Sequence, residues 1–415
     1  MKKRVVITGM GAVTPVGNNV NDMWRNIKLG MNGIETLNLI NIEDHRVKFG
    51  AEVKNLNFDD FIDRKKARHN DRFTNLALIS AIEAYENSKL HKEEIDLNRF
   101  GVIFGSGIGG LQTIENEYER GLKRGFDKIS PFFIPKSIIN LAAANIAIEL
   151  SAKATCLGIV TACASASNAI GEAFKNIKDG YTIIMLAGGA EAAFTHLGVG
   201  GFTSLTTLSD SNDPNRASIP FDAERSGFVM GEGAGSLLLE DLDHAKNRGA
   251  KIYAEIVGYG STCDAYHITA PAADGEGAVR SMEIALSDAC LAPDDIGYIN
   301  AHGTGTISND MCETIAVKKV FKDCLDKIAI SSTKSMTGHL LGASGAIEAI
   351  IAIKALEDGF MPPTINYRVP DPNCDLDVIP NVGRLRDLKY VMSNSFGFGG
   401  HNASLIFKKW EVNHE

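Results

Sequence analysis

The chain has 415 residues, of which 44% are hydrophobic and 22% charged, and its formal net charge is −9. These values are typical of a globular protein with a large core, and they argue against extensive disorder and against a nucleic-acid binder. The seven cysteines are an odd number and no two are spaced as CxxC, which disfavours a disulfide framework or a thiolate zinc site and fits a reducing compartment.

The N-terminus has the basic start of a signal peptide, but its apolar run is soon interrupted by Thr8, Gly9 and Gly11. We therefore predict a short strand over residues 4–7 followed by a turn. The longest apolar helix expected, over residues 343–356, is too short to cross a bilayer. We expect no membrane association, and a cytoplasmic location or the stroma of a plastid-type organelle.

Strands and helices alternate in the first half of the chain. The elements predicted there are helices over 21–30 and from the basic cluster 64–68 through residue 85, and strands over 100–104, 182–187 and 236–240. The strand over 100–104 runs into a GxGxxG pattern at Gly105, Gly107 and Gly110. Because no βαβ unit of the required kind opens the chain, we interpret this pattern as a tight turn against a cavity, not as a dinucleotide site.

The stretch around Cys163 is the strongest candidate for a reactive site. Apolar residues after it fall at helical spacing, and Gly180 stands where such a helix would end. Cys163 would then lie at the start of a helix, where free N–H groups and the helix dipole lower the pKa of a thiol. Its small neighbours Ala162 and Ala164 would leave the sulfur open to a bulky substrate. The alternative is a buried, inert cysteine.

The second half of the chain repeats this order of elements. We predict a helix over 277–289, strands over 296–301 and 328–331, a helix over 343–356, and a closing hairpin of 391–396 with 403–407. Two halves of similar order suggest an internal duplication, although no residue-level repeat is visible. The candidate boundary lies within 249–260.

Three loops just beyond predicted strands carry further candidate groups. They hold His302, then Lys334 with His339, and finally Phe398. In α/β sheets, strand ends of one polarity converge on the ligand crevice. A thiol, two imidazoles and a nearby ammonium group are what acyl transfer through a covalent thioester needs.

These motifs resemble those of the β-ketoacyl-acyl-carrier-protein synthases of the Cys-His-His condensing type, in the thiolase superfamily. The likeness covers residues 5–11, 161–165, 300–306, 334–343 and 394–400, in that order. It implies an α/β, thiolase-like, duplicated five-layer α-β-α-β-α sandwich, with the nucleophile in half 1–252 and both histidines in half 253–415. It also implies a homodimer that needs no metal or redox cofactor. The group that elongates medium and long chains is the most similar one.

The resemblance assigns a role to each candidate. Cys163 would carry the acyl chain as a thioester, while His302 and His339 would stabilise the enolate formed when malonyl-carrier protein loses CO2. Lys334 would orient these histidines, and the N–H groups of Cys163 and Phe398 would hold the oxyanion. The remaining implied roles are the acyl cavity (Ile108, Phe133, Phe202), the phosphopantetheine arm (Thr304, Thr306), a gate (Phe398), carrier-protein docking (Lys65, Arg68) and a structural monovalent cation (Asn300, Glu348, Ser393, Asn394).

The implied function is decarboxylative Claisen condensation of acyl- with malonyl-acyl carrier protein, both phosphopantetheine-linked, to give 3-oxoacyl-carrier protein in fatty acid elongation. A polyketide ketosynthase is chemically identical and stays an alternative. From a different class, a non-catalytic partner like the chain-length factors would lack the nucleophile that Cys163 supplies. A thiolase would carry a second active-site cysteine near its C-terminus, but Cys374 lies outside the loop over 396–400. For the basic cluster, a solvated helix start is the alternative to docking.

Overall fold

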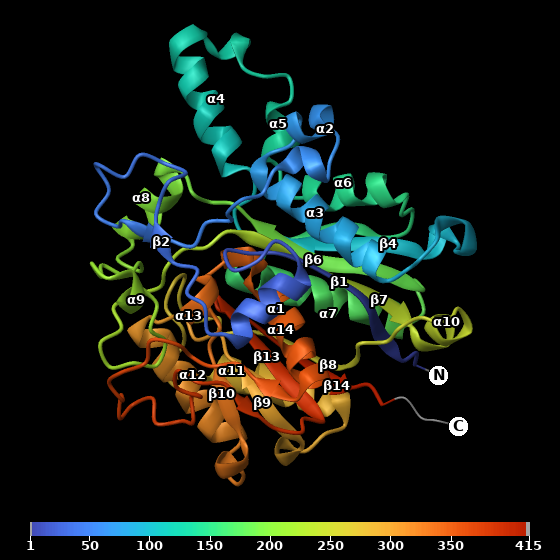
Figure 1. Ribbon diagram of the computed structural model, residues 1–415, viewed down its shortest axis with the longest axis vertical. Coiled ribbons are helices and arrows are strands. Elements are labelled where there is room, and N and C mark those ends of the chain that lie inside the picture. The colour runs from blue at the N-terminus through green and yellow to red at the C-terminus, as the bar shows by residue number, and fades with distance from the viewer. Residues whose placement is uncertain (1, 412–415) are drawn as a thin grey trace.

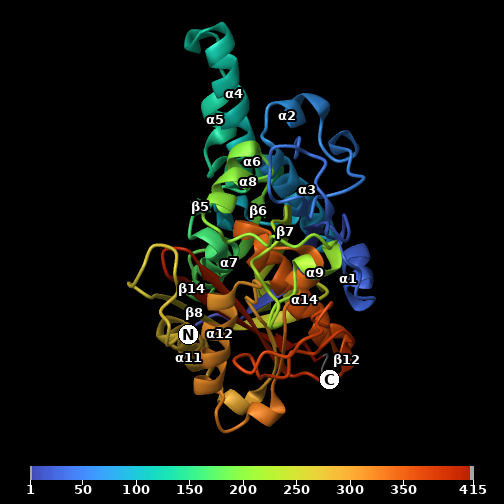
Figure 2. The same cartoon turned by 90° about the vertical axis from the view of Figure 1, so that its left-hand side faces the viewer.

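Ten strands of the protein form one continuous sheet, and the two halves of the chain arrange their five strands in the same order from the centre of the sheet outward. The computed structural model describes residues 2–411 (Figures 1 and 2). The strand order is β10-β9-β13-β14-β8-β1-β7-β6-β4-β5. The first half supplies β1 (Val5–Val13), β4 (Phe100–Gly105), β5 (Cys156–Ile159), β6 (Ile184–Glu191) and β7 (Gly233–Asp241). The second half supplies β8 (Ala254–Cys263), β9 (Ile296–Asn300), β10 (Ala329–Ser331), β13 (Tyr390–Gly397) and β14 (His401–Lys409).

Each half pairs its strands in the same way. β4 runs parallel to β5 and β6, as β9 runs parallel to β10 and β13. β7 is antiparallel to β6 and β1, as β14 is antiparallel to β13 and β8. A short antiparallel contact between β1 and β8 joins the halves. The predicted duplication is therefore present in the topology.

Helices add three further layers. Between the two halves lie α7 (Ser165–Lys178) and α14 (Ser344–Asp358), most of whose residues are buried. The outer face of the first half is covered by α3 (Arg72–Asn87), and that of the second by α11 (Glu276–Ala289) and α12 (Ile307–Val320). Figure 1 shows the resulting α-β-α-β-α arrangement, with α7 and α14 at its centre. The predicted five-layer sandwich is thus confirmed.

Shorter elements complete the chain. The remaining helices are α1 (Val20–Lys28), α2 (Arg64–Arg68), α4 (Leu111–Arg124), α5 (Phe133–Ser137), α6 (Leu141–Leu150), α8 (His196–Ser204), α9 (Pro214–Ala217), α10 (Leu242–Asn247) and α13 (Lys334–Thr337). The small pairs are β2 (Glu35–Thr36) with β3 (Phe49–Gly50) and β11 (Phe360–Met361) with β12 (Arg384–Leu385). In both ribbon views α4 projects from the body as an arm. Among residues 2–411, no helix combines the length and hydropathy needed to span a bilayer.

The repeat extends to single residues where a helix crosses a strand. A Cβ on Gly11 of β1 would lie 1.9 Å from the carbonyl oxygen of Ser80 in α3. A Cβ on Gly260 of β8 would lie 1.9 Å from the carbonyl oxygen of Ser281 in α11. The Ser80 hydroxyl hydrogen-bonds to Ser236 of the neighbouring strand β7 at 2.8 Å, and the Ser281 hydroxyl to Ser404 of the neighbouring strand β14 at 3.0 Å. Only glycine lets these helices approach so closely.

One sequence prediction was wrong for this reason. The glycines after residue 7 were interpreted as a turn, but β1 continues through them because they allow helix packing and do not reverse the chain. The predicted division between residues 252 and 253 falls in the connection from α10 to β8 and stays a prediction.

Candidate active site

Cys163 lies in a sharp turn between β5 and α7. Ala162, just before it, has φ of +50°, a left-handed conformation that costs about 1 kcal/mol or more for a residue with a side chain. A 3₁₀ turn over Ala162–Ala164 then leads into α7. The end of β13 passes so close that a Cβ on Gly397 would lie 3.0 Å from the backbone nitrogen of Cys163. The turn thereby presents the sulfur at the junction of the two halves.

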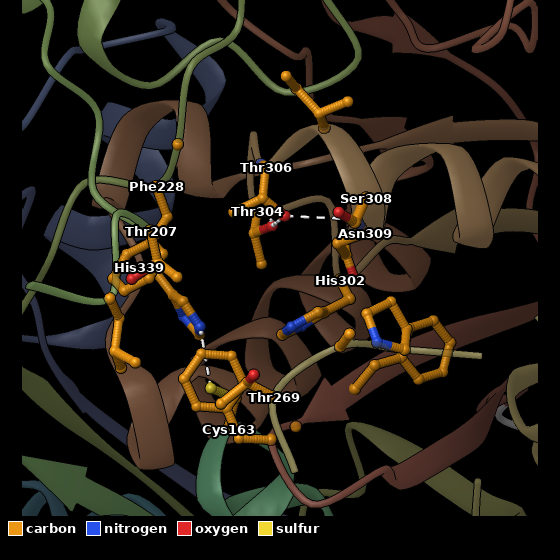
Figure 3. Close-up of a pocket in the computed structure, with 18 of the residues that line it drawn as sticks. Cys163, Thr207, Phe228, Thr269, His302, Thr304, Thr306, Ser308, Asn309 and His339 are labelled. Atoms are coloured by element: carbon orange, nitrogen blue, oxygen red, sulfur yellow. Dashed lines mark hydrogen bonds between the residues drawn. The ribbon is translucent and has the colours of Figure 1, made fainter. Parts of the chain in front are cut away.

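His339 is held by its backbone and by both ring nitrogens. Its N–H donates to the carbonyl of Val229 at 2.7 Å, and its own carbonyl accepts from the N–H of Gly231 at 2.8 Å. Nδ1 lies 2.9 Å from Oγ of Ser344, and Nε2 lies 3.2 Å from Sγ of Cys163. Figure 3 shows this ring aimed at the sulfur. The imidazole is therefore fixed before any substrate arrives.

His302 follows β9 and faces the same space. Both oxygens of the buried Glu313 anchor its loop, accepting from the N–H groups of His302 at 2.9 Å and Gly303 at 2.7 Å. Its ring meets that of His339 edge-on, with centroids 5.3 Å apart. In Figure 3 the two imidazoles lie on either side of the cavity above Cys163. The sequence prediction that these three side chains converge is confirmed.

Burial sets the charge of these groups. It lowers the pKa of His302 and of His339 well below the usual value, and the charge of Lys334 lowers both further. Burial also raises the pKa of the Cys163 thiol to about 12, although the charge of Lys334 and a hydrogen bond from the N–H of Phe398 oppose the rise. At neutral pH the substrate-free site therefore holds a neutral thiol and two neutral imidazoles.

The sequence-based expectation of a lowered thiol pKa was wrong. It counted the N-terminus of α7 as the dominant influence on Cys163. Cys163 is only partly exposed, and the cost of placing a thiolate among the groups packed around the sulfur outweighs the helix dipole and the nearby N–H donors.

Lys334 lies beneath the site on α13, with 1% of its side chain exposed, and forms an ion pair with Oε1 of Glu348. The other oxygen of Glu348 has no hydrogen-bond partner among residues 2–411, and neither do Oδ1 of Asn300 and Oγ of Ser393. Asn300 and Ser393 are paired in register on β9 and β13. Buried oxygens without partners are costly, and oxygen donors of this kind suit a hard cation.

The cavity around these groups has a volume of about 390 Å³. One wall is aromatic, since Phe228 packs edge-on against His339 with centroids 5.1 Å apart and Phe202 packs on Phe228 at 5.4 Å. Hydroxyl groups of Thr304 and Thr306 line another part. The space therefore suits a substrate with an apolar chain, a reactive centre and a polar arm.

Comparisons with known proteins agree with this geometry. Residues 2–245 match the family description "Beta-ketoacyl synthase, N-terminal domain" and residues 253–368 match "Beta-ketoacyl synthase, C-terminal domain". The chain belongs to the β-ketoacyl synthase family. It is 49% identical over 410 residues to 3-oxoacyl-[acyl-carrier-protein] synthase 2 of Staphylococcus aureus (strain COL), covering 99% of each protein.

Two solved structures of this family share the whole fold. One is a type II polyketide ketosynthase in complex with its acyl-carrier protein, with TM-score 0.92 and 36% identity over 99% of this chain and 100% of that one. The other is a β-ketoacyl synthase from Burkholderia phymatum STM815, with TM-score 0.91 and 37% identity over 99% and 100%. The thiolase-like fold expected from the motifs is the fold of this synthase.

The structure brings most of the predicted residues to one place. Those that line the cavity are Cys163, Phe202, His302, Thr304, Thr306, His339 and Phe398. Ile108 does not line it but packs beside Phe202 in the adjoining apolar cluster. Phe133 is half-buried on α5 and is not brought to the cavity. Lys65 and Arg68 are exposed on α2.

Sequence reasoning missed several groups of the synthase site. Phe228 lies in a glycine-rich stretch with no periodicity, so nothing marked it as the ring that packs on His339. Glu313 sits within a helix, where a buried carboxylate looks like any surface residue of α12. No role was predicted for Ser344, whose hydroxyl lies 2.9 Å from Nδ1 of His339.

Alkylation of Cys163 by iodoacetamide should report its buried environment. Only the thiolate reacts, so in the folded protein the rate should keep rising by about tenfold per pH unit between about pH 8 and pH 10. The denatured chain is the control, and its rate should level off once pH passes about 8.5 to 9. Peptide mass spectrometry isolates this thiol from the others. A plateau below about pH 9 in the folded protein would contradict the raised pKa.

Proposed function

We propose that this chain condenses acyl-[acyl carrier protein] with malonyl-[acyl carrier protein] to give 3-oxoacyl-[acyl carrier protein] and CO2 in fatty acid elongation. One observation carries the proposal, namely a thiol and two neutral imidazoles in one cavity, with Sγ of Cys163 3.2 Å from Nε2 of His339. The name and 49% identity of the Staphylococcus aureus synthase support elongation as the pathway.

In the first step the sulfur of Cys163 attacks the carbonyl carbon of the acyl thioester. The bond to the carrier sulfur breaks, and the proton lost by Cys163 ends on the carrier thiol. The backbone N–H of Phe398, already hydrogen-bonded to this sulfur, and that of Cys163 stabilise the oxyanion. Loss of one such donor typically costs about 3 kcal/mol of transition-state stabilisation.

In the second step malonyl-carrier protein loses CO2, and the negative charge moves onto its thioester oxygen. His302 and His339 donate N–H groups to that oxygen. We assign the Ser344 hydroxyl as the donor to Nδ1 of His339, 2.9 Å away, which places the ring hydrogen on Nε2, where it faces the substrate. The enolate carbon then attacks the carbonyl carbon of the acyl thioester. The bond to Sγ of Cys163 breaks, and the thiolate that leaves takes up a proton from solvent to restore the neutral thiol. Neutral imidazoles suit this role because they donate without adding a charge.

The buried ion pair supports both steps. The positive charge of Lys334 disfavours protonation of both histidines and favours negative charge on Cys163. We further propose that the unpartnered oxygens of Asn300, Glu348 and Ser393 hold a structural monovalent cation. Such an ion would satisfy these oxygens and lend positive charge near Glu348. The side chain of Asn394 is not among these donors, because its Oδ1 accepts from Ser404 and its Nδ2 faces Met282 on the outer side of the sheet.

A polyketide ketosynthase is the second candidate. The likeness to the type II polyketide ketosynthase, 36% identical over 99% of this chain, favours it, and the chemistry at Cys163 would be the same. Analysis of the products separates the two functions. An elongating synthase carries out one condensation on each fully reduced acyl chain, whereas a polyketide ketosynthase condenses repeatedly on unreduced chains. A non-catalytic chain-length partner is disfavoured because Cys163 and both imidazoles are in place.

Replacement of the reacting groups should separate the two steps. Cys163→Ala should abolish acyl transfer, because no sulfur remains to form the thioester. His302→Ala and His339→Ala should each slow CO2 release from malonyl-carrier protein by at least about a hundredfold, since each removes a donor to the enolate oxygen. Cys290→Ala, at an exposed cysteine, is the control. Full condensation by Cys163→Ala, or normal CO2 release by both histidine variants, would refute the assignment.

We propose that α2 docks the carrier protein. Within residues 2–411, Lys66 pairs with Glu149 at 2.8 Å and Arg64 with Asp59 at 3.5 Å, whereas the exposed Lys65 and Arg68 form no ion pair. Unpaired cations on an exposed helix attract an acidic partner and speed its encounter.

Reversing these two charges should weaken carrier binding and leave chemistry intact. For Lys65→Glu with Arg68→Glu we expect KM for carrier-bound substrates to rise about tenfold or more, with kcat little changed. Lys322→Glu with Lys327→Glu makes the same charge change at exposed positions of the second half. An equal effect on small N-acetylcysteamine thioesters, or an equal effect of the control pair, would contradict docking at α2.

We propose that the protein is a homodimer joined at β5. This strand ends the ladder, and apolar side chains stay exposed on it and beside it, with Leu157 48%, Val160 53% and Ile148 73% exposed. An exposed apolar edge strand is a template for pairing with another chain. A second copy of β5 would continue the ladder and cover these side chains.

A charge on this edge should dissociate the dimer. We expect the wild type to sediment as a dimer and Leu157→Lys to shift it toward monomer, because the lysine would have to be buried against the partner. Leu385→Lys places the same charge on β12, where the leucine is 82% exposed, and should change nothing. A wild-type monomer, or a dimer in all three proteins, would refute pairing at β5.

We propose that the reaction takes place in the cytoplasm, or in the stroma if the source is a plastid-bearing cell. All seven cysteines lie within residues 2–411 and are free thiols, as in a reducing compartment.

A further inference from the structure

The GxGxxG turn at residues 105–110 encloses an anion that belongs to the chain itself. The buried carboxylate of Glu191, at the end of β6, accepts from Oγ of Ser106 at 2.8 Å and from the N–H of Gly107 at 2.7 Å. It also accepts from the N–H groups of Ile108 at 3.1 Å and Gly109 at 3.2 Å. Successive N–H groups of this kind form a nest that elsewhere binds phosphate. Here Glu191 fills the nest, so no dinucleotide can occupy it.

The same carboxylate reaches a second segment. Its Oε2 accepts from the N–H of Gly342 at 3.1 Å, three residues after His339. The fit is tight, since a Cβ on Gly342 would lie 2.2 Å from the nitrogen of Gly107, and one on Gly107 would lie 3.4 Å from the carbonyl oxygen of Ala162. The Ile108 turn, the Cys163 turn and the turn after His339 therefore meet around Glu191.

Ile108 connects this junction to the cavity. Its side chain packs in the apolar cluster that includes Leu341, Phe202 and Phe228, and the two phenylalanines line the cavity beside Cys163. Ile108 therefore lies behind the two rings, where a long acyl chain that displaced them would meet it, whereas a short acyl group would stay near the sulfur. Because Glu191 holds the backbone of Ile108, the side chain can yield only by changing its rotamer.

We propose that Glu191 is a positioning residue that sets the acyl-length selectivity of the synthase by fixing the Ile108 turn against the turns of Cys163 and His339. The inference rests on the function proposed above. Burial raises the pKa of Glu191, and its hydrogen bonds oppose the rise. Every donor around it needs an acceptor, so the amide of Glu191→Gln would point an NH2 group at N–H groups and loosen the turn.

The test is the transfer of butyryl and palmitoyl groups from acyl carrier protein to Cys163, followed by intact-protein mass spectrometry. For Glu191→Gln we expect the ratio of palmitoyl to butyryl rates to change by at least about tenfold from the wild-type ratio, while Glu191→Asp changes it less. A general loss of folding would lower both rates together and leave the ratio unchanged.

Glu83→Gln is the matched control. Glu83 also accepts two backbone N–H bonds, from Ala12 at 2.8 Å and Val20 at 2.9 Å, but outside the cavity. Its loss should lower stability without moving the ratio. If Glu191→Gln does not fold, Ser106→Ala serves as the test instead. It removes one hydrogen bond to Glu191 and should shift the palmitoyl-to-butyryl ratio in the direction expected for Glu191→Gln.

The outcomes separate the two proposals. An unchanged ratio in a folded Glu191→Gln or Ser106→Ala protein, with Cys163 still acylated, would overturn the role of Glu191 alone. An equal shift in Glu83→Gln would also overturn it, since any buried glutamate would then suffice. A wild type that takes no acyl group on Cys163 would overturn the proposed function and this inference together.

Discussion

Exclusion of water from the junction of the two halves is the constraint on which the site depends. It makes both imidazoles neutral, because the pKa values of His302 and His339 fall well below neutrality. It also makes the thiol of Cys163 hard to ionise. In such surroundings a hydrogen bond to a developing charge is far stronger than in water. The thiol and the two imidazoles are therefore uncharged before substrate binds. Their surroundings stabilise charge that develops only during the reaction.

Duplication explains how one fold assembles this site from distant segments. Ala162 and Leu341 have φ of +50° and +49°, and each opens a 3₁₀ turn that leads into a central helix, α7 or α14. The two turns are the same device in the two halves, and they meet at the junction. Cys163, the proposed nucleophile, lies in one turn, and Gly342 takes the corresponding place in the other. The missing side chain at Gly342 leaves room for Gly107 and Glu191.

The sequence was informative wherever local rules decide the structure. The helix after Cys163 ends before Gly180 as predicted, and the hairpin of β13 and β14 forms around residues 398–400. The prediction that His302 and His339 lie on loops that follow strands was also correct. Long-range packing could not be predicted, because a glycine such as Gly11 looks the same in a turn and beneath a helix. The predicted pKa of the Cys163 thiol was wrong for a similar reason, since the burial of Cys163 depends on residues from the other half of the chain.

In the proposed mechanism, the raised pKa of Cys163 constrains the second step more than the first. When the new carbon–carbon bond forms, Cys163 must leave, and a thiolate that is costly to bury is a poor leaving group. The groups that offset this cost are fixed in place, namely the charge of Lys334 and the N–H of Phe398. Lys334 also disfavours protonation of both imidazoles. In this mechanism one buried cation, paired with Glu348 and shielded from water, would keep the hydrogen-bond donors neutral for the enolate and would stabilise the departing sulfur.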